Sequence, residues 1–168
     1  MILIALGANL PGPAGAPLDA LETALGLMPA SGIQVLARSR WYVTSPVPRS
    51  GQPDYINGVV SVDTALEPLA LMEALQGIEQ KMGRVRSVPN AARTLDLDLI
   101  DFRGLCLDSG RLTLPHPRAH LRAFVLYPLR DVAPEWRHPL TGASLDTLCA
   151  ALDPDQDIRC LEDEGAGS

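Results

Sequence analysis

The segment RTLDLDLI, from Arg93 to Ile100, alternates leucine with aspartate. Successive side chains of a β-strand point to opposite faces of the sheet, so this alternation predicts a strand with one apolar face and one acidic face. The leucines should face a core, while Asp96 and Asp98 share the other face, roughly 6.6 Å apart along the chain. Two carboxylates at that spacing repel each other unless a cation lies between them.

A divalent cation is one interpretation of this acidic pair. Mg²⁺ prefers oxygen ligands and retains several waters, so it is the default metal for two aspartates. The alternative is the ordinary solvated face of an edge strand, where charged residues are common. The strand alone favours neither interpretation over the other.

A basic segment precedes the acidic pair. Lys81, Arg84, Arg86 and Arg93 follow one another with no acidic residue between the first and the last. Guanidinium groups bind phosphate oxygens through two parallel hydrogen bonds, and arginines beside a metal are typical of a polyphosphate site. This neighbourhood favours the metal interpretation, although a solvated loop with scattered arginines remains the alternative.

The composition limits the class of protein. The chain has 168 residues, of which 46% are hydrophobic, and this predicts one globular domain over residues 1–168 with a poorly ordered tail at 153–168. A net charge of −6 argues against binding to nucleic acid or to an anionic membrane. No apolar run approaches the roughly 20 residues of a membrane span. Three widely spaced cysteines favour free thiols in a reducing cytoplasm over disulfides or zinc.

Hydrophobic periodicity and turn residues predict the order β-α-β-β-α-β, followed by short C-terminal elements. We expect strands at Ile2–Leu6, Ile33–Val43, Tyr55–Val62 and 95–100, and helices at Leu18–Met28 and Pro68–Gly83. Further on we expect short strands at Gly104–Leu107 and Arg111–Leu114, and helices at Ala119–Asp131 and Ser144–Leu152. This order is typical of an α+β sandwich with helices on one face of a mostly antiparallel sheet.

Other polar residues support more than one interpretation. Gln76 and Glu79 are three residues apart and share a helix face, which suits either a nucleotide contact or a solvated surface. His116 and His120 have the spacing of a helical zinc pair, but Pro117 between them argues against it. No phosphate-binding glycine loop is present, so side chains and metal would have to hold any nucleotide.

Four ordered motifs resemble those of the 6-hydroxymethyl-7,8-dihydropterin pyrophosphokinase family of folate biosynthesis. They are QPDYIN at Gln52–Asn57, GRVR at Gly83–Arg86, RTLDLDLI, and RLTLPHPR at Arg111–Arg118. The N-terminal LGANL is similar to the Gly-Ser-Asn segment of the family, with Ala8 in place of serine. The similarity extends from about Ile2 to Glu135.

The resemblance implies a ferredoxin-like fold and a Mg²⁺-dependent diphosphotransferase. The enzyme would transfer the β,γ-pyrophosphoryl unit of ATP to the hydroxymethyl group of the reduced pterin and release AMP. ATP and the pterin would be its partners, two Mg²⁺ ions would accompany ATP, and we expect a cytoplasmic monomer.

The resemblance also assigns residues to roles. Asp96 and Asp98 would hold the metal and act in catalysis together with Arg84, Arg86 and Arg93. By the resemblance, these arginines would belong to a mobile basic loop that closes over the phosphates. ATP would contact Gln76, Glu79, Arg86, Arg93, Leu99, Arg111, Thr113, His116 and Arg122. The pterin would contact Thr44, Val47, Tyr55, Asn57 and Phe124.

Two departures from the family pattern bear on these roles. Val88–Ala92 is one residue shorter than the usual segment and lacks its tryptophan and one arginine, and Pro117 replaces a common aromatic residue. A non-catalytic nucleotide-binding module is the second hypothesis for the chain. RNA binding is a third, and the acidic balance and the 4% aromatic content argue against it.

Overall fold

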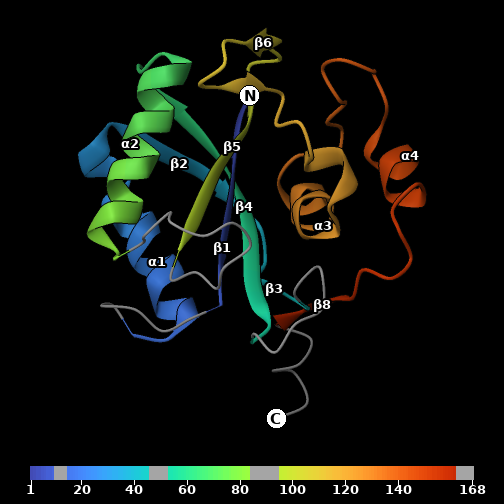
Figure 1. Cartoon of the computed structure of the whole chain (residues 1–168), viewed down its shortest axis with the longest axis horizontal. Coiled ribbons are helices and arrows are strands. Elements are labelled where there is room, and N and C mark those ends of the chain that lie inside the picture. Colours follow the sequence, from blue (N-terminus) through green and yellow to red (C-terminus); the bar gives the residue numbers. More distant parts are fainter. Residues whose placement is uncertain (10–14, 46–52, 84–94, 162–168) are drawn as a thin grey trace.

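The structure, a computed structural model, describes residues 1–9, 15–45, 53–83 and 95–161. Its centre is a six-stranded sheet in the order β5-β1-β4-β3-β8, with β2 also paired to β4 (Figure 1). The strands are β1 (Ile2–Ala8), β2 (Ile33–Arg38), β3 (Tyr42–Thr44), β4 (Tyr55–Thr64), β5 (Asp96–Phe102) and β8 (Ile158–Cys160). Each strand pairing in this sheet is antiparallel.

Helices cover both faces of the sheet (Figure 1). Helices α1 (Pro17–Leu27) and α2 (Pro68–Lys81) pack on one face, and α3 (Ala123–Val132) and α4 (Leu145–Ala150) on the other. A separate two-stranded ribbon joins β6 (Leu107–Asp108) to β7 (Thr113–Leu114). The predicted β-α-β-β-α-β order and antiparallel sheet are confirmed.

The expectation of helices on one face alone is wrong, and β1 shows why. All seven of its residues are buried. Ile4 belongs to the core under α1 and α2, whereas Leu3 and Ala5 belong to the core under α3. A strand that is apolar on both sides has to be covered on both sides, because exposing either face would leave apolar surface in water.

The strand expected over Ile33–Val43 is two strands, because the chain leaves the ladder after Arg38. The Ser39 hydroxyl oxygen accepts a hydrogen bond from the Val59 amide at 2.9 Å. A Cβ at Gly58 would lie 2.6 Å from the Trp41 ring, so this glycine leaves the space that the indole fills. The interruption thus lets Trp41 pack across β4.

A second interruption shortens the expected helix at Ala119–Asp131. A 3₁₀ turn covers Ala119–Leu121, and α3 begins only at Ala123. Between them, Arg122 has extended backbone angles, φ −118° and ψ 115°. Hydrophobic spacing alone cannot reveal one extended residue inside a helical pattern.

The chain from residue 153 to residue 161 differs from the poorly ordered tail expected from residue 153 onward, because it contains a strand of the sheet. Strand β8 pairs with β3, placing Ile158 opposite Thr44 and Cys160 opposite Tyr42. The Leu161 amide donates to the Trp41 carbonyl at 2.9 Å. The outer edge of β3 is therefore covered by a strand distant in sequence. Residues 162–168 lie outside the described residues.

The carboxylates of Asp101, which is buried, and Asp131, which is exposed, link α3 and its C-terminal extension to the sheet. The Trp136 indole N–H donates to Asp101 Oδ2 at 2.8 Å, and the Gly104 amide donates to Asp101 Oδ1 at 2.9 Å. The Tyr42 hydroxyl donates to Asp131 Oδ2 at 2.7 Å. Burial, together with this carboxylate, raises the pKa of Tyr42 to about 12.

In the part of the chain that the structure describes, none of the helices combines the length and the apolar character needed to cross a membrane.

Candidate functional site

The acidic pair lies on β5, an edge strand of the sheet. Leu97 and Leu99 are buried in the core under α1 and α2. Asp96 and Asp98 alternate with them and are half-buried, so they share the opposite face, as the sequence pattern predicts. Asp98 pairs with Ala5, which lies in the core under α3. Both carboxylates therefore face the side of the sheet that carries α3.

A polar row crosses this face near one end of the sheet. Gly7 pairs with Asp96 on one side and with Asn57 on the other. Directly paired residues of antiparallel strands point to the same face, so Asn57 lies two strands, about 10 Å, from Asp96. The Asn57 amide donates from Nδ2 to Thr44 Oγ1 at 2.8 Å, and both residues are buried. Tyr55 is two residues along β4 and so shares this face.

Gly7 makes room for this row. A Cβ at Gly7 would lie 2.7 Å from Asn57 Oδ1, closer than real Cβ atoms approach an oxygen. The absence of a side chain therefore lets the Asn57 amide lie across β1 toward the acidic pair. An isolated glycine in an otherwise apolar strand, such as Gly7 in β1, is the sequence signal of such a close approach.

On the side of β5 that has no neighbouring strand, a backbone amide donates its hydrogen bond to a side chain. The Leu97 amide donates to Glu79 Oε2 at 2.8 Å, and Glu79 is only 2% exposed. The carboxylate takes the place of a neighbouring strand and holds the backbone between the two aspartates. Glu79 was expected at the ATP site, and the structure places it beneath the strand that carries the acidic pair.

His116 and Arg122 lie on the same side as the acidic pair. The His116 amide donates to the Ile100 carbonyl at 2.9 Å. Burial, followed by the positive charge of Arg122, lowers the pKa of His116 to about 4, with Asp96 acting in the opposite direction. Because Nδ1 accepts a hydrogen bond from the Arg118 amide at 3.2 Å, the neutral ring carries its proton on Nε2. The side chain therefore offers one N–H donor at neutral pH.

This depressed pKa predicts how stability varies with pH. The unfolded chain binds a proton at His116 near pH 6.5, whereas the folded chain does so only near pH 4. The contribution of neutral His116 to the free energy of unfolding is therefore complete above pH 6.5 and is lost as the pH falls toward 4. Between pH 7 and pH 4 the free energy of unfolding falls in both proteins, and we expect the fall to be about 3 kcal/mol smaller in His116→Asn than in the wild type. Urea unfolding of both proteins without Mg²⁺ or nucleotide measures it, and equal losses would contradict the assignment.

The remaining predicted ATP contacts lie around the ribbon and α2. The Arg111 guanidinium forms an exposed ion pair with Glu73 at 3.0 Å. Thr113 donates to Asp108 at 3.4 Å across the ribbon. Gln76 is half-buried on α2. The Leu99 side chain is in the core, which leaves its backbone as the part that a nucleotide could meet.

Among the residues predicted to contact the pterin, Phe124 packs against the core under α3, and the Arg122 guanidinium carbon lies 5.2 Å from the centre of its ring. Four predicted site residues lie outside the described residues: Val47, Arg84, Arg86 and Arg93.

The donor set fits Mg²⁺ better than zinc. In the described ranges, no group of three or more histidine, cysteine or acidic side chains is arranged to hold a metal. Mg²⁺ commonly takes one or two carboxylates and completes its shell with phosphate oxygens and water. Asp96 and Asp98 supply such a pair of oxygen ligands on one face.

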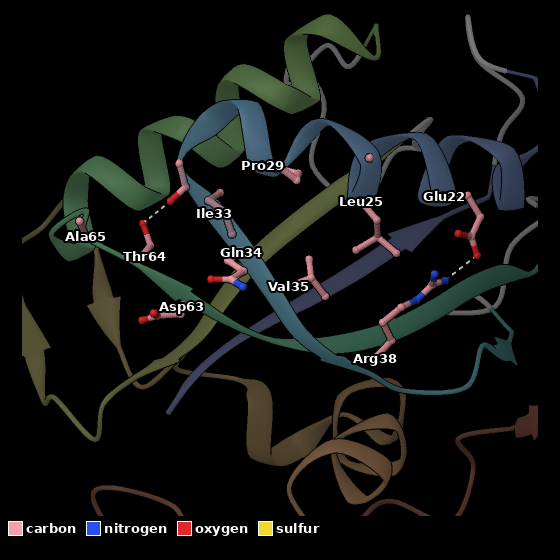
Figure 2. A pocket seen from close by; sticks show the side chains of 12 residues that line it. Glu22, Leu25, Pro29, Ile33, Gln34, Val35, Arg38, Asp63, Thr64 and Ala65 are labelled. Carbon is pink, nitrogen blue, oxygen red and sulfur yellow. Dashed lines mark hydrogen bonds and ion pairs between the residues drawn. The ribbon is translucent and has the colours of Figure 1, made fainter.

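A cavity elsewhere on the molecule contains none of these residues. It measures 730 Å³ and lies between α1 and β2 (Figure 2). The ion pair between Arg38 and Glu22, 2.6 Å long, lines one end, and Leu25 and Val35 form part of its apolar wall (Figure 2).

The chain is similar in sequence to characterised enzymes. A sequence model of the family described as 7,8-dihydro-6-hydroxymethylpterin-pyrophosphokinase (HPPK) matches residues 3–134. The 2-amino-4-hydroxy-6-hydroxymethyldihydropteridine pyrophosphokinase of Pseudomonas aeruginosa is 44% identical over 153 residues, which is 89% of this chain and 90% of that protein. The protein of the same name from Synechocystis sp. is 41% identical over 152 residues, 90% of this chain and 75% of that protein.

The fold is also similar to that of solved structures. Wild-type HPPK-DHPS of Plasmodium falciparum with pteroate gives a TM-score of 0.67 at 16% sequence identity, and the match covers 88% of this chain and 43% of that chain. The present chain therefore spans less than half of that longer protein, and this likeness shows the fold alone.

These comparisons place the protein among the pyrophosphokinases, which are transferases. Within that class, the chain belongs to the HPPK family, as 132 matched positions from residue 3 to residue 134 require.

Proposed function

We propose that this chain transfers the β,γ-pyrophosphoryl unit of ATP to 6-hydroxymethyl-7,8-dihydropterin, a step of folate biosynthesis. The observation that carries the proposal is the polar row on one face of the sheet, with Asp96 at one end and the Asn57–Thr44 pair at the other. A phosphate-binding end and a heterocycle-binding end on one surface suit a reaction between ATP and a small planar alcohol.

In this reaction the hydroxymethyl oxygen attacks the β-phosphorus of ATP. The bond from that phosphorus to the oxygen bridging to the α-phosphate breaks, and AMP leaves with the electron pair. Such transfer depends mainly on alignment and on offsetting the phosphate charge. Asp96 and Asp98 would hold Mg²⁺, which when bound neutralises phosphate charge and lowers the pKa of the attacking hydroxyl.

The two ends of the row would hold the two substrates. Asn57, oriented by Thr44, would hydrogen-bond the polar edge of the pterin, with Tyr55 and Phe124 against its ring. On the phosphate side, the Nε2–H of His116 would donate to a phosphate oxygen. Arg122 would add positive charge there.

Arg84, Arg86 and Arg93, which lie outside the described residues, would supply further charge in the same proposal, and closure over the phosphates would exclude water. Val47 would add a backbone contact to the pterin. We further propose a monomeric, cytoplasmic enzyme whose partners are its small-molecule substrates.

The direct test is to incubate the purified protein with Mg-ATP and the hydroxymethyl dihydropterin and to separate the nucleotides. We expect AMP and the pterin diphosphate in equal amounts, no AMP when the pterin is omitted, and no product in excess EDTA. Formation of ADP would contradict the proposal. Calorimetric binding of Mg-ATP without any turnover would instead support a non-catalytic nucleotide-binding module.

A substitution at Gly7 tests the pterin end. In Gly7→Ala the added methyl group would displace the buried Asn57 amide, and we expect the KM for the pterin to rise about tenfold while overpacking costs about 1–3 kcal/mol. Steady-state kinetics and urea unfolding measure the two effects.

The matched control is Gly26→Ala in α1, where an added Cβ meets nothing within 4 Å. This variant should keep its KM and gain up to about 1 kcal/mol, because alanine is the better helix former. An unchanged pterin KM in Gly7→Ala would remove Asn57 from the pterin site.

A further inference from the structure

Gln156, in the segment between α4 and β8, binds the backbone on both sides of Arg122. Its Oε1 accepts a hydrogen bond from the Ala123 amide at 2.9 Å, and its Nε2 donates to the Leu121 carbonyl at 2.9 Å. In extended backbone, the carbonyl before a residue and the amide after it point to the same side. The side-chain amide therefore pairs with Arg122 in the way that a neighbouring strand would.

This pairing explains why the chain is extended at Arg122. The residue lies between the 3₁₀ turn and α3, where a continuous helix would form its own backbone hydrogen bonds. Gln156 pairs with the two groups that the extended residue turns outward, of which the Ala123 amide is part-buried and would lose free energy if it were left without an acceptor. Arg122 then leaves the backbone in a fixed direction, beside Phe124 at 5.2 Å and within electrostatic range of His116.

The same segment continues into β8, which pairs with the strand that carries Thr44. Two residues beyond Gln156, β8 pairs with β3, placing Ile158 opposite Thr44. Arg159 forms an ion pair with Asp54 at 3.4 Å, immediately before Tyr55. One short stretch of chain thus contacts the turn that carries Arg122 and the strand that carries Thr44.

We propose that Gln156 is a positioning residue for Arg122, so that its side-chain amide sets where the guanidinium meets the nucleotide. The proposal rests on the proposed function, because the nucleotide role of Arg122 comes from it. Gln156 lies beyond the region that the family model matches, 3–134, and the sequence gives no sign of its contacts.

The test measures binding of a non-hydrolysable ATP analogue with Mg²⁺ by calorimetry, so that its readout does not require turnover. In Gln156→Met, which keeps the length of the side chain and removes both hydrogen bonds, we expect the Kd to rise about tenfold. Gln34→Met, an exposed glutamine of β2 at the cavity between α1 and β2, is the control and should bind as the wild type does.

A double substitution separates positioning from general loosening of the fold. Once Arg122→Ala has removed the guanidinium, adding Gln156→Met should weaken analogue binding by less than about twofold. A tenfold loss in both backgrounds would overturn the proposal. So would an unchanged Kd in Gln156→Met, or a wild-type protein that does not bind the analogue.

Two further measurements keep the outcomes distinct. If Gln156→Met does not fold, Gln156→Glu takes its place in the test. The glutamate can still accept the hydrogen bond from the Ala123 amide, but it sets an oxygen against the Leu121 carbonyl. An unchanged Kd in Gln156→Glu overturns the proposal equally. In steady-state kinetics, the KM for ATP should rise while the KM for the pterin changes less than about twofold. If the wild type forms AMP and the Kd is unchanged in Gln156→Met, the inference about Gln156 is rejected and the proposed function stands. If analogue binding depends on Gln156 but the wild type forms no AMP, the proposed function is rejected and the inference about Gln156 stands.

Discussion

Asp96→Asn and Asp98→Asn should each lower kcat at least about a thousandfold if the two carboxylates hold Mg²⁺ as proposed, because losing such a ligand would remove roughly 4 kcal/mol of charge stabilisation from the transition state. The amide keeps the size and half-buried position of the carboxylate but removes its charge. Both variants should therefore fold, because the substitution removes charge without changing side-chain volume. AMP formation under saturating substrates and urea unfolding test the two statements.

The control for charge removal is Asp63→Asn on β4. Asp63 is 63% exposed in its side chain and, among the described residues, forms a long ion pair with Arg103 at 3.8 Å, so its loss should leave kcat within about twofold of the wild type. Turnover near the wild-type rate in either Asp96→Asn or Asp98→Asn would exclude a metal-binding role for that carboxylate. Raising the Mg²⁺ concentration should restore part of the activity if the variant has lost affinity for the ion.

Glu79→Leu should reduce stability and turnover together. The substitution leaves the Leu97 amide buried without its acceptor, at a cost of about 2–3 kcal/mol for a hydrogen bond to a charged group. In a protein of this size that corresponds to a fall in Tm of roughly 6–10 °C. Since Leu97 lies between the two aspartates, a shift of β5 also changes their spacing, and we expect kcat to fall about tenfold or more.

Glu79→Gln separates these effects from the loss of charge. Its amide oxygen can still accept from Leu97, so most of the stability should remain. Glu73→Gln, an exposed acid on the same helix, controls for the change in net charge. A Glu79→Leu protein with wild-type Tm and kcat would show that the edge strand holds its position without this carboxylate.

The features that the sequence predicted well depend on local pattern. Alternation in RTLDLDLI placed Asp96 and Asp98 on one face of a strand, and the structure agrees. Strand and helix order followed from periodicity in the same way. The coverage of both sheet faces could have been suspected from the continuous apolar run of β1, because a half-exposed strand would alternate.

The features that the sequence did not predict depend on partners far along the chain. Strand β8 has three residues and becomes a strand because the edge of β3 is there to pair with it. The extended backbone at Arg122 depends in the same way on Gln156, 34 residues later. The approach of Asn57 to Gly7 requires the register between β1 and β4, which no local pattern supplies.

The contacts of residues 156–161 have a consequence for protein synthesis. The helices on one face and the central strands are complete in the chain by Phe102, so they can pack while translation continues. The direction of Arg122 and the outer edge of β3 must wait for the last-made residues of the described chain. A ribosome-bound nascent chain would thus form the core under α1 and α2 before it formed the core under α3 or a complete substrate site, and a chain ending shortly before residue 156 would lack the contacts that fix the direction of Arg122.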